Sequence, residues 1–253
     1  PRRRPREPGS IGRTGTRSNP PRGHEPKVAD QAVPPRRFHR PCCTPAEAKG
    51  REASLEAPPP RAYQEPAGGN PSQMRAPPER VERTLVALRR VALEDEAALF
   101  RASRDPEVMR YMDWPMPAEP AETGAHLRKA ARWWDEGAEF QFAIEERATG
   151  LLVGTIAFRP RVPAADFGYF LAREHWGKGF AHEAASWVVG WLQAQPELLR
   201  IWATADAENV RSRALLERLG LRLEEILPRA TLRPNLGGPP RDTARYAWNR
   251  SQG

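Results

Sequence analysis

A strand, a turn with two glycines and a helix follow one another between residues 166 and 195. Phe167, Tyr169 and Leu171 alternate with polar or small residues, which is the period of a strand. The turn Trp176-Gly177-Lys178-Gly179-Phe180-Ala181 comes next, and apolar residues then recur at helical spacing. A strand joined to a helix in this way predicts a layered α/β fold.

The glycine turn has the properties of a phosphate-binding site. The first N–H groups of a helix lack acceptors within the helix, and the helix dipole adds partial positive charge there. Gly177 and Gly179 let the backbone approach a phosphate closely, and Lys178 can add charge. The turn is not a dinucleotide fingerprint, because His182 replaces the third glycine, and no Walker Gly-Lys-Ser/Thr occurs. Two glycines also fit a simple strand-to-helix turn, so by itself the turn predicts only some phosphate-bearing ligand.

From residue 84 onward the chain alternates between strand and helix patterns. The predicted strands are residues 84–90, 140–144, 151–158, 166–172, 199–205, 221–227 and 243–248, and the predicted helices are residues 94–103, 105–112, 119–136, 180–195 and 210–219. This order predicts an α/β protein with one sheet of about seven strands of mixed direction, flanked by helices.

The first 80 residues differ in composition from the rest. They contain 17 of the 28 prolines and carry a net charge of +8, whereas residues 81–253 are charge-balanced. Few apolar residues and many prolines predict disorder. Two interpretations remain: a basic arm that contacts nucleic acid or an acidic surface, or a translated upstream region with the true start near Met74. The balanced charge gives no reason to expect nucleic acid as a partner of the folded domain, residues 81–253.

Cysteine and apolar content exclude several further classes. The only cysteines, Cys42 and Cys43, are adjacent and lie in the proline-rich part, which is neither a disulfide framework nor a zinc site. No apolar run approaches the length of a membrane span, and no signal peptide is recognisable. We therefore expect a cytoplasmic protein without a membrane partner or a metal.

A second motif narrows the ligand. Thirty residues after Gly179, Asn209-Val210-Arg211-Ser212 opens a helix that ends at Glu217-Arg218-Leu219-Gly220-Leu221. With both motifs in this order, the chain resembles the GNAT superfamily of N-acetyltransferases over residues 82–250. Within it, the chain resembles the type that acetylates α-amino groups of ribosomal proteins.

The resemblance implies a mostly antiparallel mixed sheet in which the fourth and fifth strands, 166–172 and 199–205, are parallel and splay apart to hold acyl-CoA. Backbone groups of Phe170, Leu171 and Ala172 would pair with the pantetheine arm. The segment Trp176, Gly177, Lys178, Gly179, Phe180 and Ala181 would hold the pyrophosphate of acetyl-CoA, and Asn209 would bind near the sulfur.

The resemblance also implies direct attack of a neutral amine on the thioester. Many members protonate the departing thiolate with a tyrosine, but Leu216 stands at that position. Ser212 is the nearest hydroxyl in register and is our candidate, although it also fits a simple helix-start role. Glu224 and Glu225 are candidates for the general base, unless both face solvent. Arg110–Trp114 is expected to form the acceptor wall.

The sequence leaves the acceptor open. A protein N-terminal α-amine is the leading hypothesis, and a small amine such as an antibiotic, polyamine or amino acid is the second. The replacement by Leu216 also permits a non-catalytic CoA-binding regulator. A monomer and a homodimer are both compatible with the sequence, and the loops around 110–120 and 228–242 carry no recognisable acceptor signature.

Overall fold

A computed structural model describes residues 74–251, in which eight strands form a single mixed sheet. The strand order is β1-β2-β3-β4-β5-β6-β8-β7. The strands are β1 (Arg80–Glu82), β2 (Val86–Arg90), β3 (Phe140–Glu146), β4 (Leu152–Arg161), β5 (Ala164–Leu171), β6 (Arg200–Asp206), β7 (Arg222–Thr231) and β8 (Arg241–Asn249). The predictions for residues 1–73, including disorder and the basic arm, lie outside the described residues.

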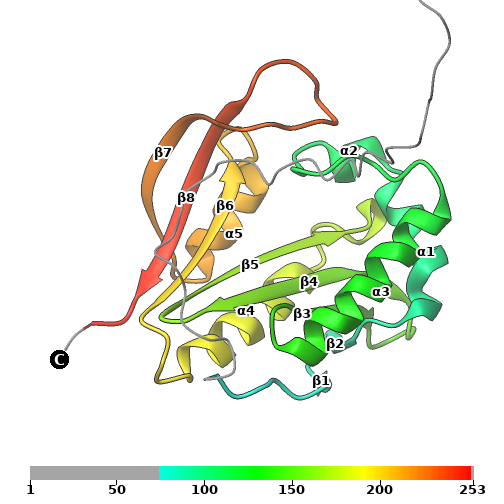
Figure 1. The fold of residues 1–253 in the computed structure, drawn as a ribbon, viewed down its shortest axis with the longest axis horizontal. Coiled ribbons are helices and arrows are strands. Elements are labelled where there is room, and N and C mark those ends of the chain that lie inside the picture. Colours follow the sequence, from blue (N-terminus) through cyan, green and yellow to red (C-terminus); the bar gives the residue numbers. More distant parts are fainter. Residues whose placement is uncertain (1–73, 252–253) are drawn as a thin grey trace, which may run out of the picture. The chain divides into compact units, whose positions relative to one another are not determined.

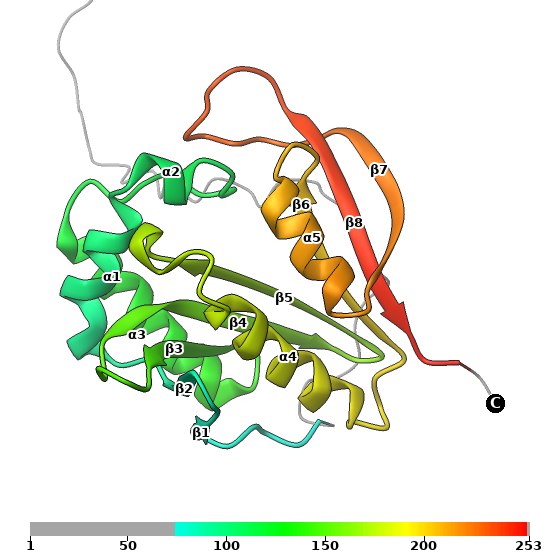
Figure 2. The ribbon, with the colours of Figure 1, turned by 180° about the vertical axis from the view of Figure 1, so that it is seen from behind.

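Helices cover both faces of this sheet. The helices are η2 (Leu93–Asp95), α1 (Glu96–Ser103), α2 (Pro106–Met109), α3 (Pro120–Glu136), η3 (Arg173–His175), α4 (Phe180–Gln193) and α5 (Val210–Arg218). Figure 1 shows α1 and α3 in front of the sheet, and Figure 2 shows α4 and α5 on the opposite face. The prediction of an α/β fold with a mixed, mostly antiparallel sheet is confirmed.

The core lies mainly between the sheet and α4. The β3–β4 hairpin pairs Phe140 with Phe158 and Phe142 with Ile156, so that all four side chains share one face and are buried. Val188 of α4 is fully buried in the same cluster. Alternation along the strands thus explains the burial of one face and predicts the hairpin correctly.

Helix ends follow the turn chemistry of the sequence. Asp105 is the N-cap of α2, and its carboxylate accepts the Glu107 N–H at 2.8 Å. Gly137 ends α3 with φ +71°, a left-handed conformation that favours glycine. These predicted boundaries are confirmed. By contrast α2 ends at Met109, three residues before the predicted Met112.

Two strand predictions need correction. The sheet has eight strands instead of about seven, because the three-residue β1 pairs with β2 and is too short to show a period. β7 continues past Leu227 to Thr231 through Pro228. Proline is tolerated there because β7 is an edge strand, and its register with β8 shifts between Leu227 and Thr231.

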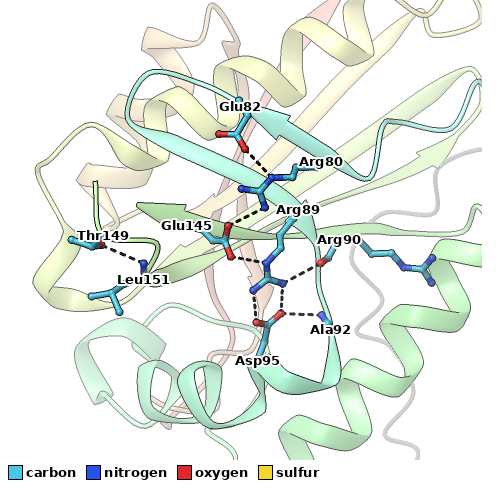
Figure 3. A network of polar contacts seen from close by, with 9 residues as sticks. All are labelled: Arg80, Glu82, Arg89, Arg90, Ala92, Asp95, Glu145, Thr149 and Leu151. Carbon is cyan, nitrogen blue, oxygen red and sulfur yellow. Dashed lines mark hydrogen bonds and ion pairs between the residues drawn. The ribbon is translucent and has the colours of Figure 1, made fainter. Parts of the chain in front are cut away.

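An arginine joins the first strands to the start of the helical layer (Figure 3). The Arg89 guanidinium on β2 donates to Glu145 on β3 at 2.6 Å and to both oxygens of Asp95 at 2.6 and 2.8 Å. Asp95 also accepts the Ala92 N–H at 2.9 Å. This bidentate contact fixes the exit of the chain from β2 toward α1.

None of the helices between residues 74 and 251 combines the length and the apolar composition that a membrane span needs.

Candidate active site

The sheet opens between β5 and β6. These strands are parallel and pair only from Ala164 to Asp166 and from Arg200 to Trp202. Beyond Asp166, β5 keeps β4 as its neighbour while β6 continues along β8, and the two strands diverge (Figure 1). The predicted splayed pair is therefore present, one strand later in the numbering because of β1.

Strand pairing decides which backbone groups face this opening. The Ala172 N–H donates to the Val153 C=O at 2.9 Å and so points toward β4. Because backbone groups alternate along an antiparallel ladder, Phe170 also faces β4, whereas Tyr169 and Leu171 face the opening. Of the three residues predicted to contact pantetheine, the structure therefore turns only Leu171 toward the opening. The Leu171 C=O accepts the Trp176 indole N–H at 2.9 Å, which ties the following loop to β5.

The glycine turn lies at the mouth of the opening. Gly177 and Gly179 have φ values of +76° and +87°, and α4 starts directly after Gly179 without a side-chain cap. The N–H groups of its first turn are therefore left for a ligand or solvent. The opening between β5 and β6 is part of one large groove. Five of the predicted phosphate ligands line this groove, and Lys178 does not; the five are Trp176, Gly177, Gly179, Phe180 and Ala181.

The start of α5 forms the other side of the opening. Asn209 caps this helix, and its side-chain oxygen accepts the Ser212 N–H at 3.2 Å. Both residues line the groove. Leu216, where the resemblance expects a tyrosine, is 1% exposed and packs in the core.

A tyrosine on β5 reaches α5 instead. Burial raises the pKa of the Tyr169 hydroxyl; a hydrogen bond from Ser212 and the charge of Arg218 oppose the shift only in part. Tyr169 therefore stays protonated at neutral pH, beside Ser212 and within the groove lining. The sequence interpretation placed Tyr169 on a strand face only. The contact with Ser212 joins residues 43 positions apart, for which local periodicity gives no signal.

The groove lining also contains two buried carboxylates that are held by arginines. The Arg159 Nε donates to Asp166 at 2.7 Å. Asp206, with a fully buried side chain, accepts the Arg241 Nε at 2.8 Å, and the Arg233 Nε lies at 3.5 Å. Burial acts to raise the pKa of Asp206, but the bond from Arg241, the Glu208 N–H and the neighbouring charges lower it overall. Neither carboxylate is arranged as a base.

Glu224 and Glu225 are not brought together with the other candidates. The Glu224 carboxylate accepts both terminal nitrogens of Arg200 at 2.6 Å each. This hydrogen bonding lowers the pKa of Glu224 and makes it a weaker base. Glu225 forms a short ion pair with Arg245. Neither glutamate lines the groove, because the irregular β7 register directs them to these arginines. Their placement argues against the predicted role as general base.

The whole groove has a volume of about 2260 Å³. This exceeds the roughly 300–1,000 Å³ of a typical small-ligand pocket, so it has room for a cosubstrate and an acceptor together. The predicted acceptor wall, Arg110–Trp114, lines it, as do parts of α3 and of the loop after β7. Among the described residues, no cluster of three or more His, Cys, Asp or Glu side chains is placed to hold a metal ion.

Known proteins share this architecture. Residues 86–222 match the acetyltransferase (GNAT) domain family. The uncharacterized N-acetyltransferase YoaA from Bacillus subtilis (strain 168) is 31% identical over 170 residues, which are 66% of this chain and 94% of YoaA. The structure of Mycobacterium smegmatis RimJ in complex with CoA-disulfide is 25% identical, covers 65% of this chain and 81% of RimJ, and has a TM-score of 0.57.

A further solved structure shows the same fold. RimL, the ribosomal L7/L12 alpha-N-protein acetyltransferase in complex with coenzyme A, covers 66% of this chain and 95% of its own with a TM-score of 0.59. At 20% identity, this likeness concerns the fold alone.

Proposed function

The chain belongs to the GNAT acetyltransferase family, and on that premise we propose that it transfers the acetyl group of acetyl-CoA to the α-amino group of a protein N-terminus. As a member of this family it is an N-acetyltransferase. The proposal therefore concerns the acceptor and the roles of individual residues.

The glycine turn is the proposed site for the pyrophosphate of acetyl-CoA. The N–H groups from Gly177 to Ala181 lie where a helix start and two left-handed glycines favour an anion. Lys178 would add charge from outside the groove. The pantetheine arm would follow β5 through the opening, and Asn209 would contact its sulfur end. The RimJ complex with CoA-disulfide supports this cosubstrate.

The proposed reaction is a direct transfer in a ternary complex. A neutral amine attacks the thioester carbon, the C–N bond forms, the C–S bond breaks, and the new amide loses its extra proton to solvent. The N–H of Leu171 faces the opening, where it can donate to the carbonyl oxygen as negative charge develops. The thiolate takes the Tyr169 proton, and Ser212 and solvent restore it. Tyr169 would thus replace the tyrosine that is missing at Leu216.

The pairing of the two buried groove carboxylates, Asp166 and Asp206, with arginines is the observation that carries the α-amine proposal. Asp166 and Asp206 are bound by arginines, so an amine that needs a strong base would find none in them. At pH 7 about one in ten α-amines with a pKa near 8 is neutral, against fewer than about one in a thousand lysines. An α-amine can therefore react with water as the only proton acceptor. A weakly basic small amine meets the same condition, so the acceptor panel must include one.

Thiol release from acetyl-CoA tests the proposal. Peptides with a free N-terminus are compared with the same peptides carrying an acetylated N-terminus and an internal lysine, with spermidine and free amino acids, and with glycinamide as the weakly basic small amine. We expect release only with free N-termini, in amounts that match N-terminal acetylation by mass spectrometry. Turnover of the small amines alone would contradict the proposed acceptor and favour the second hypothesis.

A further inference from the structure

One asparagine joins two loops that are more than 100 residues apart in sequence. Asn235 lies between β7 and β8, and its side-chain oxygen accepts the Met116 N–H at 2.8 Å. Its amide nitrogen donates to the Met109 C=O at 2.8 Å and to the Trp114 C=O at 2.9 Å. One side chain thus satisfies three backbone groups, one at the last residue of α2 and two in the loop between α2 and α3.

Residues of the β7–β8 segment alternate between the groove and solvent. Thr231 and Arg233 are buried and line the groove, whereas Leu232 is exposed and Leu236 is 37% exposed. Asn235 continues the alternation and is half-buried, but its side chain is bound to the chain around Met109–Met116 and does not itself line the groove. The segment therefore turns its polar side chains toward the α2–α3 loop.

A charge interaction supports the same junction. The buried Arg233 guanidinium is attracted by Asp113 of the α2–α3 loop and by Asp206 at the end of β6. Figures 1 and 2 both show the β7–β8 loop extending toward α2. Residues of both loops line one groove, and the three Asn235 bonds join these loops directly behind that lining, because Asn235 and Met116 are not lining residues themselves.

We propose that Asn235 is a positioning residue of the acceptor site, which holds the α2–α3 and β7–β8 loops at a fixed separation and restricts the site to narrow, extended amines such as the first residues of a polypeptide. The acceptor class rests on the proposed function, whereas the loop junction does not. Moving the α2–α3 and β7–β8 loops apart would require breaking all three hydrogen bonds of the Asn235 amide. Bulky acceptors are therefore disfavoured at this end, while acetyl-CoA binds at the glycine turn.

Amide hydrogen exchange tests the junction without any substrate. In the full chain we expect the Met116 N–H to be protected, and Asn235→Ala to increase its exchange at least tenfold. Asn235→Asp keeps the acceptor oxygen but loses both donors, so Met116 should retain part of its protection. Leu236→Ala changes an exposed neighbour and should leave Met116 exchange unchanged. Equal Met116 exchange in the original protein and Asn235→Ala would overturn the proposal.

Acceptor selectivity tests the consequence. The probes are two short peptides with free N-termini, one starting with serine and one with tryptophan, assayed by thiol release. Asn235→Ala should raise KM for the serine peptide about tenfold, leave KM for acetyl-CoA within about twofold, and reduce the preference for serine over tryptophan. If Asn235→Ala changed KM for the serine peptide and KM for acetyl-CoA equally, or left the preference for serine over tryptophan unchanged, Asn235 would have only a structural role.

The two proposals fail in different ways. If no peptide is acetylated but Met116 exchange responds to Asn235→Ala, the peptide acceptor is wrong and the junction stands. If peptides are acetylated with unchanged selectivity in Asn235→Ala, the acceptor stands and the role of Asn235 is wrong.

Discussion

The hydroxyls of Tyr169 and Ser212 meet from two different elements, and this pair defines the residue scale of the site. If Tyr169 protonates the thiolate, Tyr169→Phe should lower kcat about tenfold, which is less than the roughly 100- to 10,000-fold typical of general acid–base catalysis, because a thiolate already leaves readily. Ser212→Ala should lower kcat less, and the double variant should match Tyr169→Phe because the two act as one unit.

Steady-state kinetics at saturating acetyl-CoA would measure these effects. Tyr246→Phe is the matched control, since its hydroxyl bonds Glu217 and Arg213 of α5 but does not line the groove. It should lower stability without changing kcat. An unchanged kcat in Tyr169→Phe would remove Tyr169 from the mechanism.

Gly179 is the second residue at which a single change should be decisive. Its φ of +87° is strained for any L side chain, and an added Cβ would lie 3.3 Å from the Leu85 Cδ1. Gly179→Val should therefore weaken acetyl-CoA binding at least tenfold and cost about 1–2 kcal/mol of stability. The stability cost comes from the left-handed backbone, which the sequence alone does not reveal.

Isothermal titration with acetyl-CoA and urea unfolding would measure both effects. Gly190→Ala is the control: Gly190 lies in α4 without a positive φ, and a Cβ added there would meet no atom within 4 Å. It should keep acetyl-CoA affinity and gain about 0.5–1 kcal/mol. Unchanged affinity in Gly179→Val would show that the turn does not hold the phosphates.

The sequence predicted those site residues that belong to local motifs. Gly177, Gly179 and Asn209 lie where a turn or a helix start places them, so their position in the groove follows from neighbouring residues. Glu224 and Asn235 depend on partners far along the chain. Glu224 is bound by Arg200 and Asn235 by the α2–α3 loop, and neither pairing leaves a trace in local composition.

At the scale of elements, α4 and β2 are joined by one carboxylate. Glu183, in the first turn of α4, accepts the N–H groups of Thr84, Leu85 and Val86 at 3.1, 2.7 and 2.9 Å. These bonds fix the entry of β2 beside the glycine turn. Because hydrogen bonds to a charged group contribute about 1.5–3 kcal/mol, Glu183→Ala should destabilise the protein by about 3 kcal/mol and Glu183→Gln by about half as much.

Urea unfolding at neutral pH would measure the loss. Glu174→Ala serves as control, because the Glu174 side chain is 73% exposed and its removal should change stability by less than about 0.5 kcal/mol. Equal stability of Glu183→Ala and Glu174→Ala would mean that the β2 entry is held by its strand pairing alone.

Elements with a clear period were predicted within a few residues, and those without one were not. α3 has an apolar stripe and a terminal Gly137, and both of its ends were predicted closely. β1 has three residues, too few for a period, and forms only because β2 offers an edge. The extension of β7 through Pro228 depends in the same way on its position at the edge of the sheet.

At the scale of the whole molecule, Asp206 links stability to pH. The folded-state pKa of Asp206 is lowered, so its stabilising effect is present above its unfolded pKa near 4 and is lost as pH falls through the folded value. Asp206→Asn should be less stable than the original protein at pH 7, and the difference should shrink toward pH 3. Urea unfolding at both pH values measures this. A difference that is independent of pH would mean that Asp206 acts through shape instead of charge.

The extent of the folded unit is a second property of the whole molecule. The Met74 side chain is 7% exposed within the main core, and the Arg75 guanidinium lies 5.5 Å from the Trp191 ring centroid. These contacts precede the boundary near residue 80 that composition suggests. A chain of residues 74–253 should therefore be as stable as the full chain, whereas residues 80–253 should lose about 2 kcal/mol.

Thermal unfolding of the three chains with and without acetyl-CoA would separate folding from ligand binding. A ligand at one hundred times its Kd stabilises by about 2.7 kcal/mol, and we expect this gain in all three chains because each retains the groove. Steeply salt-dependent RNA binding by the full chain that is lost in residues 74–253 would support the basic arm. Equal stability of residues 80–253 and the full chain would show that Met74 and Arg75 add nothing, because the buried area of one methionine alone predicts a measurable loss.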